Sequence, residues 1–247
     1  MSRSADLSML HLGIVTPMAN EAPTAVEFVE EVLDACISRG FAAVTLFVVV
    51  DTASHDETRT LLEEHATRRP QLRVVWAPES RGVADAYVRG YREALAAGCD
   101  WILEIDAGFS HDPRQIGTFL DELAAGRDCV FGTRFAAGGS NAGTLRRRAI
   151  SRGGTALANL LLGTRLTDMT GGFELFTREA LEQVMAKGIR STGPFFQTEI
   201  RTHCRNLRHV EVPIAYDAAS HRVGGRAIRE ALANLARLFY LRLAGQL

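Results

Sequence analysis

The chain has 247 residues, of which 47% are hydrophobic and 23% charged, and its formal net charge is −1. Such a length and composition are typical of one globular domain with a sizeable core, so we expect a single domain over residues 1–247. The balanced charge argues against a nucleic-acid binder, which would normally be clearly basic.

The cysteines and the N-terminal residues indicate the compartment. The four cysteines are far apart and form no C-x-x-C pair, so neither a zinc site nor a disulfide framework is predicted. Residues 1–10 lack the apolar run of a signal peptide, and no stretch approaches the ~20 apolar residues of a membrane span. We therefore expect a cytoplasmic protein that is soluble or attached peripherally to the inner face of the membrane.

The first half of the chain alternates short apolar runs with segments of helical periodicity. The apolar runs predict strands at 12–16, 44–50, 72–76, 101–105 and 129–132. The periodic segments predict helices at 24–38, 55–68, 83–97 and 113–125. Strands separated by helices of this length imply right-handed βαβ units, and hence an α/β fold with a mostly parallel sheet.

The second half is less regular. It predicts a Gly- and Ala-rich mobile loop at 135–143, helices at 146–162, 195–206 and 228–243, a turn-rich segment at 167–176 and a strand at 209–214. No G-x-G-x-x-G follows the first strand and no G-x-x-x-x-G-K-[ST] occurs. A dinucleotide-binding dehydrogenase and a P-loop NTPase are therefore disfavoured.

Ligands of an open parallel sheet bind beyond the carboxyl ends of the strands. Acidic residues follow the first, second and fourth predicted strands, and Arg134 follows the fifth. Acids at one edge suit a divalent cation or a ribose, and arginine suits a pyrophosphate. Asp51 and Asp106 directly end apolar strands, which favours a ligand role, whereas Asp56 and Asp112 favour helix capping.

Several motifs in order resemble those of the family 2 glycosyltransferases. The motifs are Pro17 to Glu21, Val48 to Thr58, Asp106 to Pro113, Gly132 to Arg134, Asp168 to Phe173, Phe196 to Glu199 and Val210 to Ile214. They are most similar to the dolichyl-phosphate or polyprenyl-phosphate mannosyltransferase branch, over about residues 11–226. The resemblance implies a GT-A fold, with helices flanking the sheet, and an inverting transfer from a nucleotide sugar. Beyond this core, the spacing of apolar residues predicts an amphipathic helix at about 226–244.

The resemblance also implies a set of site residues. The expected contacts with the nucleotide sugar are Pro17, Asn20, Glu21, Asp51, Ser54, Gly82, Ala107, Arg134, Gln197, Arg222 and Arg226. Asp106 and Glu199 are the expected ligands of a Mg²⁺ or Mn²⁺ ion bridging the diphosphate. The expected catalytic residues are Asp106, Asp168 and Glu199.

The chain departs from the family pattern at three places. The usual D-D-G-S reads Asp51-Thr52-Ala53-Ser54, the usual D-x-D reads Asp106-Ala107-Gly108, and the usual S-G-F-R reads Gly171-Gly172-Phe173-Glu174. Losing a carboxylate should weaken cation binding, although Glu104, Glu199 or His111 could assist Asp106. Glu174 in place of arginine argues against an anionic lipid-phosphate acceptor and favours a neutral acceptor or a cation partner for the acceptor.

The identity of the acceptor decides the mechanism. A phosphate acceptor is already an anionic nucleophile, whereas a hydroxyl acceptor needs a general base within hydrogen-bond reach. The sequence offers four candidates for that base without choosing among them: Asp168, Glu174, Glu199 and His111.

Two arginine-rich segments have two interpretations each. The final predicted helix is amphipathic, and it packs either on the core or a dimer partner, or on anionic lipid. The Arg146-Arg147-Arg148 run near Arg152 is either a solvated face or a receptor for a lipid phosphate.

Three hypotheses of function remain. The first is transfer of mannose from GDP-mannose to a polyprenyl phosphate. The second is a soluble transferase that uses GDP-mannose or a UDP-sugar and acts on a small-molecule hydroxyl, which Gly108, Glu174 and the lack of a membrane segment favour. The third is a non-catalytic nucleotide-sugar-binding relative. A sugar nucleotidyltransferase is disfavoured because no Gly-rich loop with a lysine follows the first strand.

Overall fold

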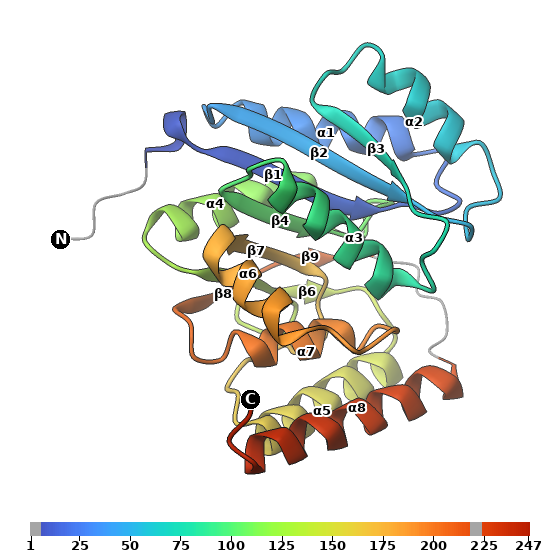
Figure 1. The fold of residues 1–247 in the computed structure, drawn as a ribbon. Helices are drawn as coiled ribbons and strands as arrows, with labels where there is room; N and C mark the ends of the chain where they lie inside the picture. Colours follow the sequence, from blue (N-terminus) through green and yellow to red (C-terminus); the bar gives the residue numbers. More distant parts are fainter. Residues whose placement is uncertain (1–5, 218–223) are drawn as a thin grey trace.

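The computed structural model describes residues 6–217 and 224–247. A seven-stranded sheet with the order β3-β2-β1-β4-β7-β5-β8 forms its centre (Figure 1). The strands are β1 His11–Pro17, β2 Ala43–Val50, β3 Leu72–Trp76, β4 Trp101–Ile105, β5 Cys129–Thr133, β7 Phe173–Thr177 and β8 His209–Pro213. All neighbours are parallel except β7, which runs antiparallel to both β4 and β5.

Helices cover both faces of the sheet. On one face lie α1 Ala25–Ile37, α2 Thr58–Ala66 and α4 Ile116–Ala124, and on the other lie α3 Val83–Ala96, α6 Arg178–Lys187 and α7 Phe196–His203. Two longer helices, α5 Leu145–Leu162 and α8 Gly225–Leu243, lie side by side at the end of the molecule beyond α7 (Figure 1). Smaller elements are the 3-10 helices Leu7–Met9 and Pro113–Gln115, and a ribbon of β6 Ser140–Asn141 with β9 Ala215–Tyr216.

The apolar run of β2 shows why the sheet is central. Leu46, Val48 and Val50 belong to the core on one face, whereas Phe47 and Val49 belong to the core on the other. Successive side chains of a strand point to opposite faces, so a strand that is apolar at every position must be covered twice. The predicted α/β class with a mostly parallel sheet is confirmed.

The second half of the chain differs from the sequence expectation in three elements. The segment predicted to be turn-rich contains β7, a buried strand in the middle of the sheet. Helix α6 was not predicted, and the expected loop at 135–143 contains the short strand β6. Because β7 runs antiparallel, its start lies at the edge where the parallel strands end, and Gly171 and Gly172 are placed there.

None of the described helices is both long enough and apolar enough to cross a membrane.

Candidate active site

The loops after β1 and β2 are fastened together by Asn20. Its side-chain amide donates to the carbonyl of Ala53 at 2.9 Å, and its side-chain oxygen accepts from the N–H of His55 at 2.9 Å. Its own N–H donates to Ser54 Oγ at 3.1 Å. Asn20 and Phe109, after β4, are the two non-glycine residues with positive φ within the described ranges. Such backbone costs about 1–3 kcal/mol and gathers at functional sites, which indicates that the site lies at this edge.

The acids after β2 and β4 differ in how many hydrogen bonds they accept. Asp56 accepts from the N–H groups of Ala22 at 3.0 Å and Thr58 at 3.1 Å, and Asp112 accepts from the N–H of Arg114 at 2.9 Å. The capping interpretation is confirmed for Asp112, which is the N-cap of the 3-10 helix Pro113–Gln115. The N-cap of α2 is Glu57, so Asp56 instead joins the loop after β1 to the first N–H of this helix. Asp51 only accepts from the N–H of Ala53, at 2.8 Å, and stays at the edge of the sheet.

Asp106 follows β4 at the centre of this edge, and its side chain is 41% exposed. Tyr87 of α3 is buried and donates its hydroxyl to Asp106 Oδ1 at 2.6 Å. A Cβ at Gly172 would lie 2.8 Å from Asp106 Oδ2, so only glycine lets the start of β7 pass this close. The carboxylate is therefore fixed on one side and open to solvent on the other.

His111 lies against the same carboxylate. Its Nε2 is 3.5 Å from Asp106 Oδ2, its ring is fully buried between those of Phe173 and Tyr216, and neither ring nitrogen has a hydrogen-bond partner. The described residues contain no cluster of three or more His, Cys, Asp or Glu ligands. Asp106 and this unsatisfied nitrogen fit a divalent cation only if phosphate oxygens of a bound nucleotide complete its shell, which is how Mg²⁺ commonly binds.

Arg134 and Asp168 form a buried ion pair beside the site. Arg134 Nε donates to Asp168 Oδ2 at 2.7 Å and Nη2 donates to Oδ1 at 2.9 Å, with exposed fractions of 7% and 0%. Burial raises the pKa of Asp168, but the hydrogen bonds and charge of Arg134 outweigh it and lower the pKa to about 2. Asp168 is thus placed as the fixed partner of Arg134 rather than as an accessible general base.

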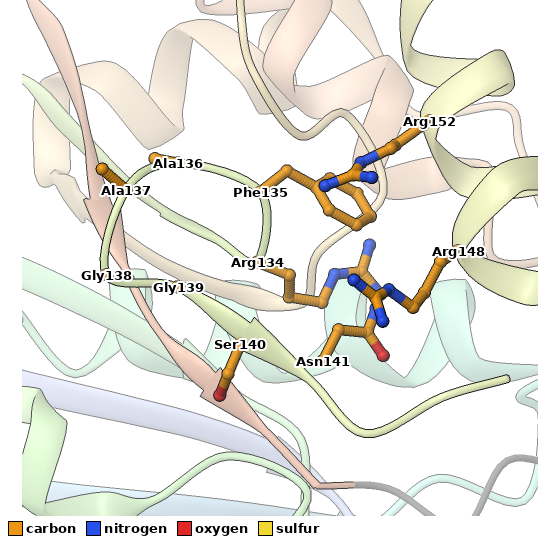
Figure 2. A pocket seen from close by; sticks show the side chains of 10 residues that line it. All are labelled: Arg134, Phe135, Ala136, Ala137, Gly138, Gly139, Ser140, Asn141, Arg148 and Arg152. Carbon is orange, nitrogen blue, oxygen red and sulfur yellow. The ribbon is translucent and has the colours of Figure 1, made fainter. Parts of the chain in front are cut away.

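A pocket of about 450 Å³ opens beside Arg134 (Figure 2). It is lined by the 134–141 segment and by Arg148 and Arg152, which project from successive turns of α5. Arg152 lies over the ring of Phe135 at 5.1 Å. Neither Arg148 nor Arg152 has a carboxylate within 4.0 Å among the described residues, whereas Arg134 is paired. The pocket therefore carries uncompensated positive charge and suits an anion.

A second polar network is buried under the sheet edge. Glu104 and Glu174 are cross-strand partners on β4 and β7, and both are fully buried. Arg201 of α7 donates to Glu174 at 2.6 Å, while Tyr91 and Gln197 donate to Glu104. Burial raises the pKa of Glu104 well above its ordinary value, and the nearby charge of Glu174 raises it further.

These contacts place three of the expected side chains, those of Glu174, Gln197 and Glu104, away from the open part of the site. Glu174 does not face an acceptor, because it is the partner of Arg201, so its charge does not argue against a lipid phosphate. Gln197 is 4% exposed and bound to Glu104, so neither of them lies open to the donor sugar or a cation.

Glu199 is also placed differently from the expectation. It is fully buried and accepts from Ser191 Oγ at 2.6 Å, from the N–H of Ser191 at 2.9 Å and from Arg237 of α8. None of its contacts is with Asp106. It is therefore an ion-pair partner that joins α7 to α8 rather than a ligand or catalytic group beside Asp106.

The remaining expected residues lie around the edge or outside it. Pro17 ends β1, Ala107 follows Asp106, and Gly82 precedes α3. Arg226 is exposed in the first turn of α8, and Arg222 lies outside the described residues.

Three residues of the site were missed in the sequence: Tyr87, Arg201 and Tyr216. Tyr87 is spaced as a core residue of α3, and nothing in the sequence links it to Asp106. Arg201, four residues after Gln197 on α7, could have been found as a charge on the apolar side of a helix.

A mostly parallel sheet covered on both faces, with carboxylates and arginines at its carboxyl edge, is typical of α/β proteins that bind a ligand at that edge. The sequence matches the family described as Glycosyl transferase family 2 over residues 13–185. An undecaprenyl-phosphate mannosyltransferase of Micrococcus luteus is 32% identical over 196 residues, covering 77% of this chain and 80% of the relative. A polyprenol monophosphomannose synthase of Mycolicibacterium smegmatis is 30% identical over 230 residues, covering 90% and 84%. The chain belongs to glycosyl transferase family 2 and is a glycosyltransferase.

Solved structures agree on the fold. A glucosyl-3-phosphoglycerate synthase of Mycobacterium tuberculosis, determined with Mn²⁺, UDP-glucose and phosphoglyceric acid, superposes with a TM-score of 0.67 at 20% identity, covering 94% of this chain and 80% of that one. A mannosyl-3-phosphoglycerate synthase of Rubrobacter xylanophilus gives 0.64 at 19% identity, covering 96% and 76%. The fold is GT-A, as the sequence resemblance implied.

Proposed function

We propose that this glycosyltransferase moves mannose from GDP-mannose to a polyprenyl phosphate, with inversion at the anomeric carbon. The observation that carries the acceptor class is the pocket of Figure 2, where Arg148 and Arg152 have no carboxylate partner among the described residues. A phosphate monoester would supply the missing negative charge. The names of the two curated relatives support the same acceptor and the mannosyl group.

A chain of contacts connects this pocket to Asp106. Arg134 lies over the ring of Tyr216 at 5.2 Å, the ring of Tyr216 lies 5.1 Å from that of His111, and His111 reaches Asp106. An acceptor phosphate beside Arg134 would therefore be close to a donor sugar held near Asp106. Bringing both reactants to one place accounts for much of the rate enhancement in transfers of this kind.

The proposed reaction needs no general base. An oxygen of the acceptor phosphate attacks the anomeric carbon, the bond from that carbon to the diphosphate breaks, and the nucleoside diphosphate leaves with the bonding electrons. Asp168, Glu174 and Glu199 are all buried in ion pairs, which fits an acceptor that is already anionic. A bound Mg²⁺ or Mn²⁺ held by Asp106 would neutralise charge on the leaving diphosphate.

The pair α5 and α8 offers a surface for the lipid. Among the described residues, eight of the twelve large exposed hydrophobic side chains lie on these two helices. They are Leu145, Ile150, Leu157 and Leu160 on α5, and Ile228, Leu232, Tyr240 and Leu243 on α8. At 100° per residue each set of four occupies one side of its helix. We propose that this face rests on the membrane that carries the acceptor.

The homodimer left open by the sequence stays a prediction.

The proposal is tested with purified protein, labelled GDP-mannose or UDP-glucose, and vesicles that contain polyprenyl phosphate. Vesicles with the corresponding dephosphorylated polyprenol are the matched control. We expect label to enter the lipid only from GDP-mannose and only with the phosphate present. Transfer to the polyprenol or to a small hydroxyl compound would contradict the acceptor assignment, and transfer from UDP-glucose alone would contradict the donor assignment.

A further inference from the structure

Position 108 has an unusual neighbour. Gly108 has φ +72°, and a Cβ built there would lie 3.0 Å from both carboxylate oxygens of Glu21 and 3.3 Å from its Cδ. The carboxylate of Glu21, from the loop after β1, thus occupies the space that a side chain at position 108 would enter. Because Asp106 and Gly108 are separated by one residue, this carboxylate lies where the second acid of a D-x-D pair would be.

Glu21 is held in this position by its own loop. Its N–H donates to Thr58 Oγ1 at 2.8 Å, and its Oε2 accepts from Thr24 Oγ1 at 3.1 Å. Its carbonyl also accepts from the N–H of Ala25, the first residue of α1, at 2.8 Å. The backbone on both sides of Glu21 is therefore fixed, and no arginine, lysine or histidine among the described residues forms an ion pair with its carboxylate.

An independent observation concerns His111, which lies beside Asp106. His111 is fully buried, both of its ring nitrogens lack a partner, and Nε2 faces Asp106 at 3.5 Å. A buried polar atom without a hydrogen bond costs about 1–3 kcal/mol unless something binds there. This unsatisfied nitrogen lies beside the carboxylate that would hold a cation.

We propose that Glu21 supplies the second carboxylate of the cation site, in place of the acid that position 108 lacks. Asp106 and Glu21 would bind one Mg²⁺ or Mn²⁺ from two different loops, and oxygens of the nucleoside diphosphate would complete its shell. Two carboxylates plus substrate phosphates are a sufficient protein contribution for such an ion. The inference rests on the proposed function, because it needs the diphosphate of a nucleotide sugar.

The test moves the carboxylate from position 21 to position 108. Binding of Mn²⁺ to the full chain with saturating GDP is measured by electron paramagnetic resonance for the wild type, Glu21→Gln, Gly108→Asp and the double variant. We expect Glu21→Gln to weaken Mn²⁺ binding by about tenfold or more, since one of two ligand charges is lost. Asp is tolerated at positive φ better than most residues, so the double variant should recover most of the affinity. Glu57→Gln, an exposed acid after β2, is the control and should bind as the wild type does.

Two further measurements separate the explanations. GDP binding measured without metal shows whether Glu21→Gln acts on the nucleotide alone. If Glu21→Gln weakens this metal-free GDP binding and the double variant with Gly108→Asp does not restore it, the inference is overturned. Unchanged Mn²⁺ affinity of Glu21→Gln would overturn it too. If the wild type binds no Mn²⁺ but still transfers mannose in EDTA, the inference fails and the proposed function stands. If transfer is absent under every condition, the proposed function fails.

Discussion

Replacing Asp168 by Asn tests whether a buried ion pair holds the arginine pocket in place. The pKa of Asp168 is lowered from 3.8 to about 2, because the bonds and charge of Arg134 outweigh the effect of burial, which alone would raise it. At 1.36 kcal/mol per pKa unit, the ion pair stabilises the folded chain by about 2 kcal/mol at neutral pH. A change of this size lowers the Tm of a chain this long by about 4–8 °C.

The assay is urea unfolding of the wild type and Asp168→Asn between pH 7 and pH 3. A lowered carboxyl pKa stabilises above the unfolded value of 3.8, and this contribution is lost as the pH falls through about 2. The difference between the two proteins should therefore be constant near neutral pH and shrink below about pH 5. The variant should also raise the KM for the acceptor more than the KM for the donor, because Arg134 loses its anchor.

A matched control uses an aspartate whose two carboxylate oxygens also accept hydrogen bonds from one arginine, but at the surface of the molecule. Asp112 pairs with Arg114, which is 85% exposed, and an exposed pair contributes at most about 1 kcal/mol. Asp112→Asn should therefore lose much less stability than Asp168→Asn. Equal losses in the two variants, or a difference for Asp168→Asn that stays constant down to pH 3, would refute the reasoning.

Three further predictions follow from the pocket, the buried network and the helix pair. Arg148→Gln and Arg152→Gln should each raise the KM for polyprenyl phosphate about tenfold or more in initial-rate assays, because a hydrogen bond to a charged group contributes about 1.5–3 kcal/mol. Burial raises the pKa of Glu174 to about 7 against the opposing charge of Arg201, so the wild type should lose stability in urea as the pH rises from 4.5 through 7. Glu174→Gln should lose less over the same range, with the remaining loss coming from Glu104, whose pKa is also raised by burial. Leu232→Asp should weaken flotation with anionic vesicles, because it places a charge in the exposed apolar face.

Each of these predictions has an exposed control outside the feature it tests. The controls are Arg127→Gln for the pocket, Glu63→Gln for the pH dependence and Met9→Asp for the vesicles. An acceptor KM that both pocket variants leave unchanged would contradict the phosphate assignment. The same pH slope in Glu174→Gln as in the wild type would show that this carboxyl does not titrate as described. Equal flotation of Leu232→Asp and Met9→Asp would contradict the membrane face.

The strands of the first half could be predicted because they are buried on both faces, as in β2, where every position from Val44 to Val50 is buried. Strand β7 could not be predicted in the same way. Its second residue, Glu174, is an acidic group whose burial depends on Arg201, which lies 27 residues later on another helix. A polar residue in a central strand is stabilised by a partner that local patterns do not contain.

The positions of the site residues could be predicted only in part, because some of them depend on partners that are distant in the sequence. Asp106 was found because the edge of a parallel sheet follows from the order of strands. Glu199 was assigned to the same edge because it lies in a motif, but direction on a helix decides its role. Gln197 and Arg201 are four residues apart and share the side of α7 that faces the sheet, whereas Glu199 points toward Arg237 of α8.

The central claim is that this chain transfers mannose to a polyprenyl phosphate at the Asp106 edge of the sheet. One measurement tests it most directly. Transfer of label from GDP-mannose to polyprenyl phosphate is followed for the wild type and for Asp106→Ala, with circular dichroism to verify folding. The account predicts labelled lipid from the wild type and none from a folded Asp106→Ala variant. Full activity of Asp106→Ala, or no labelled lipid from the wild type, would contradict it.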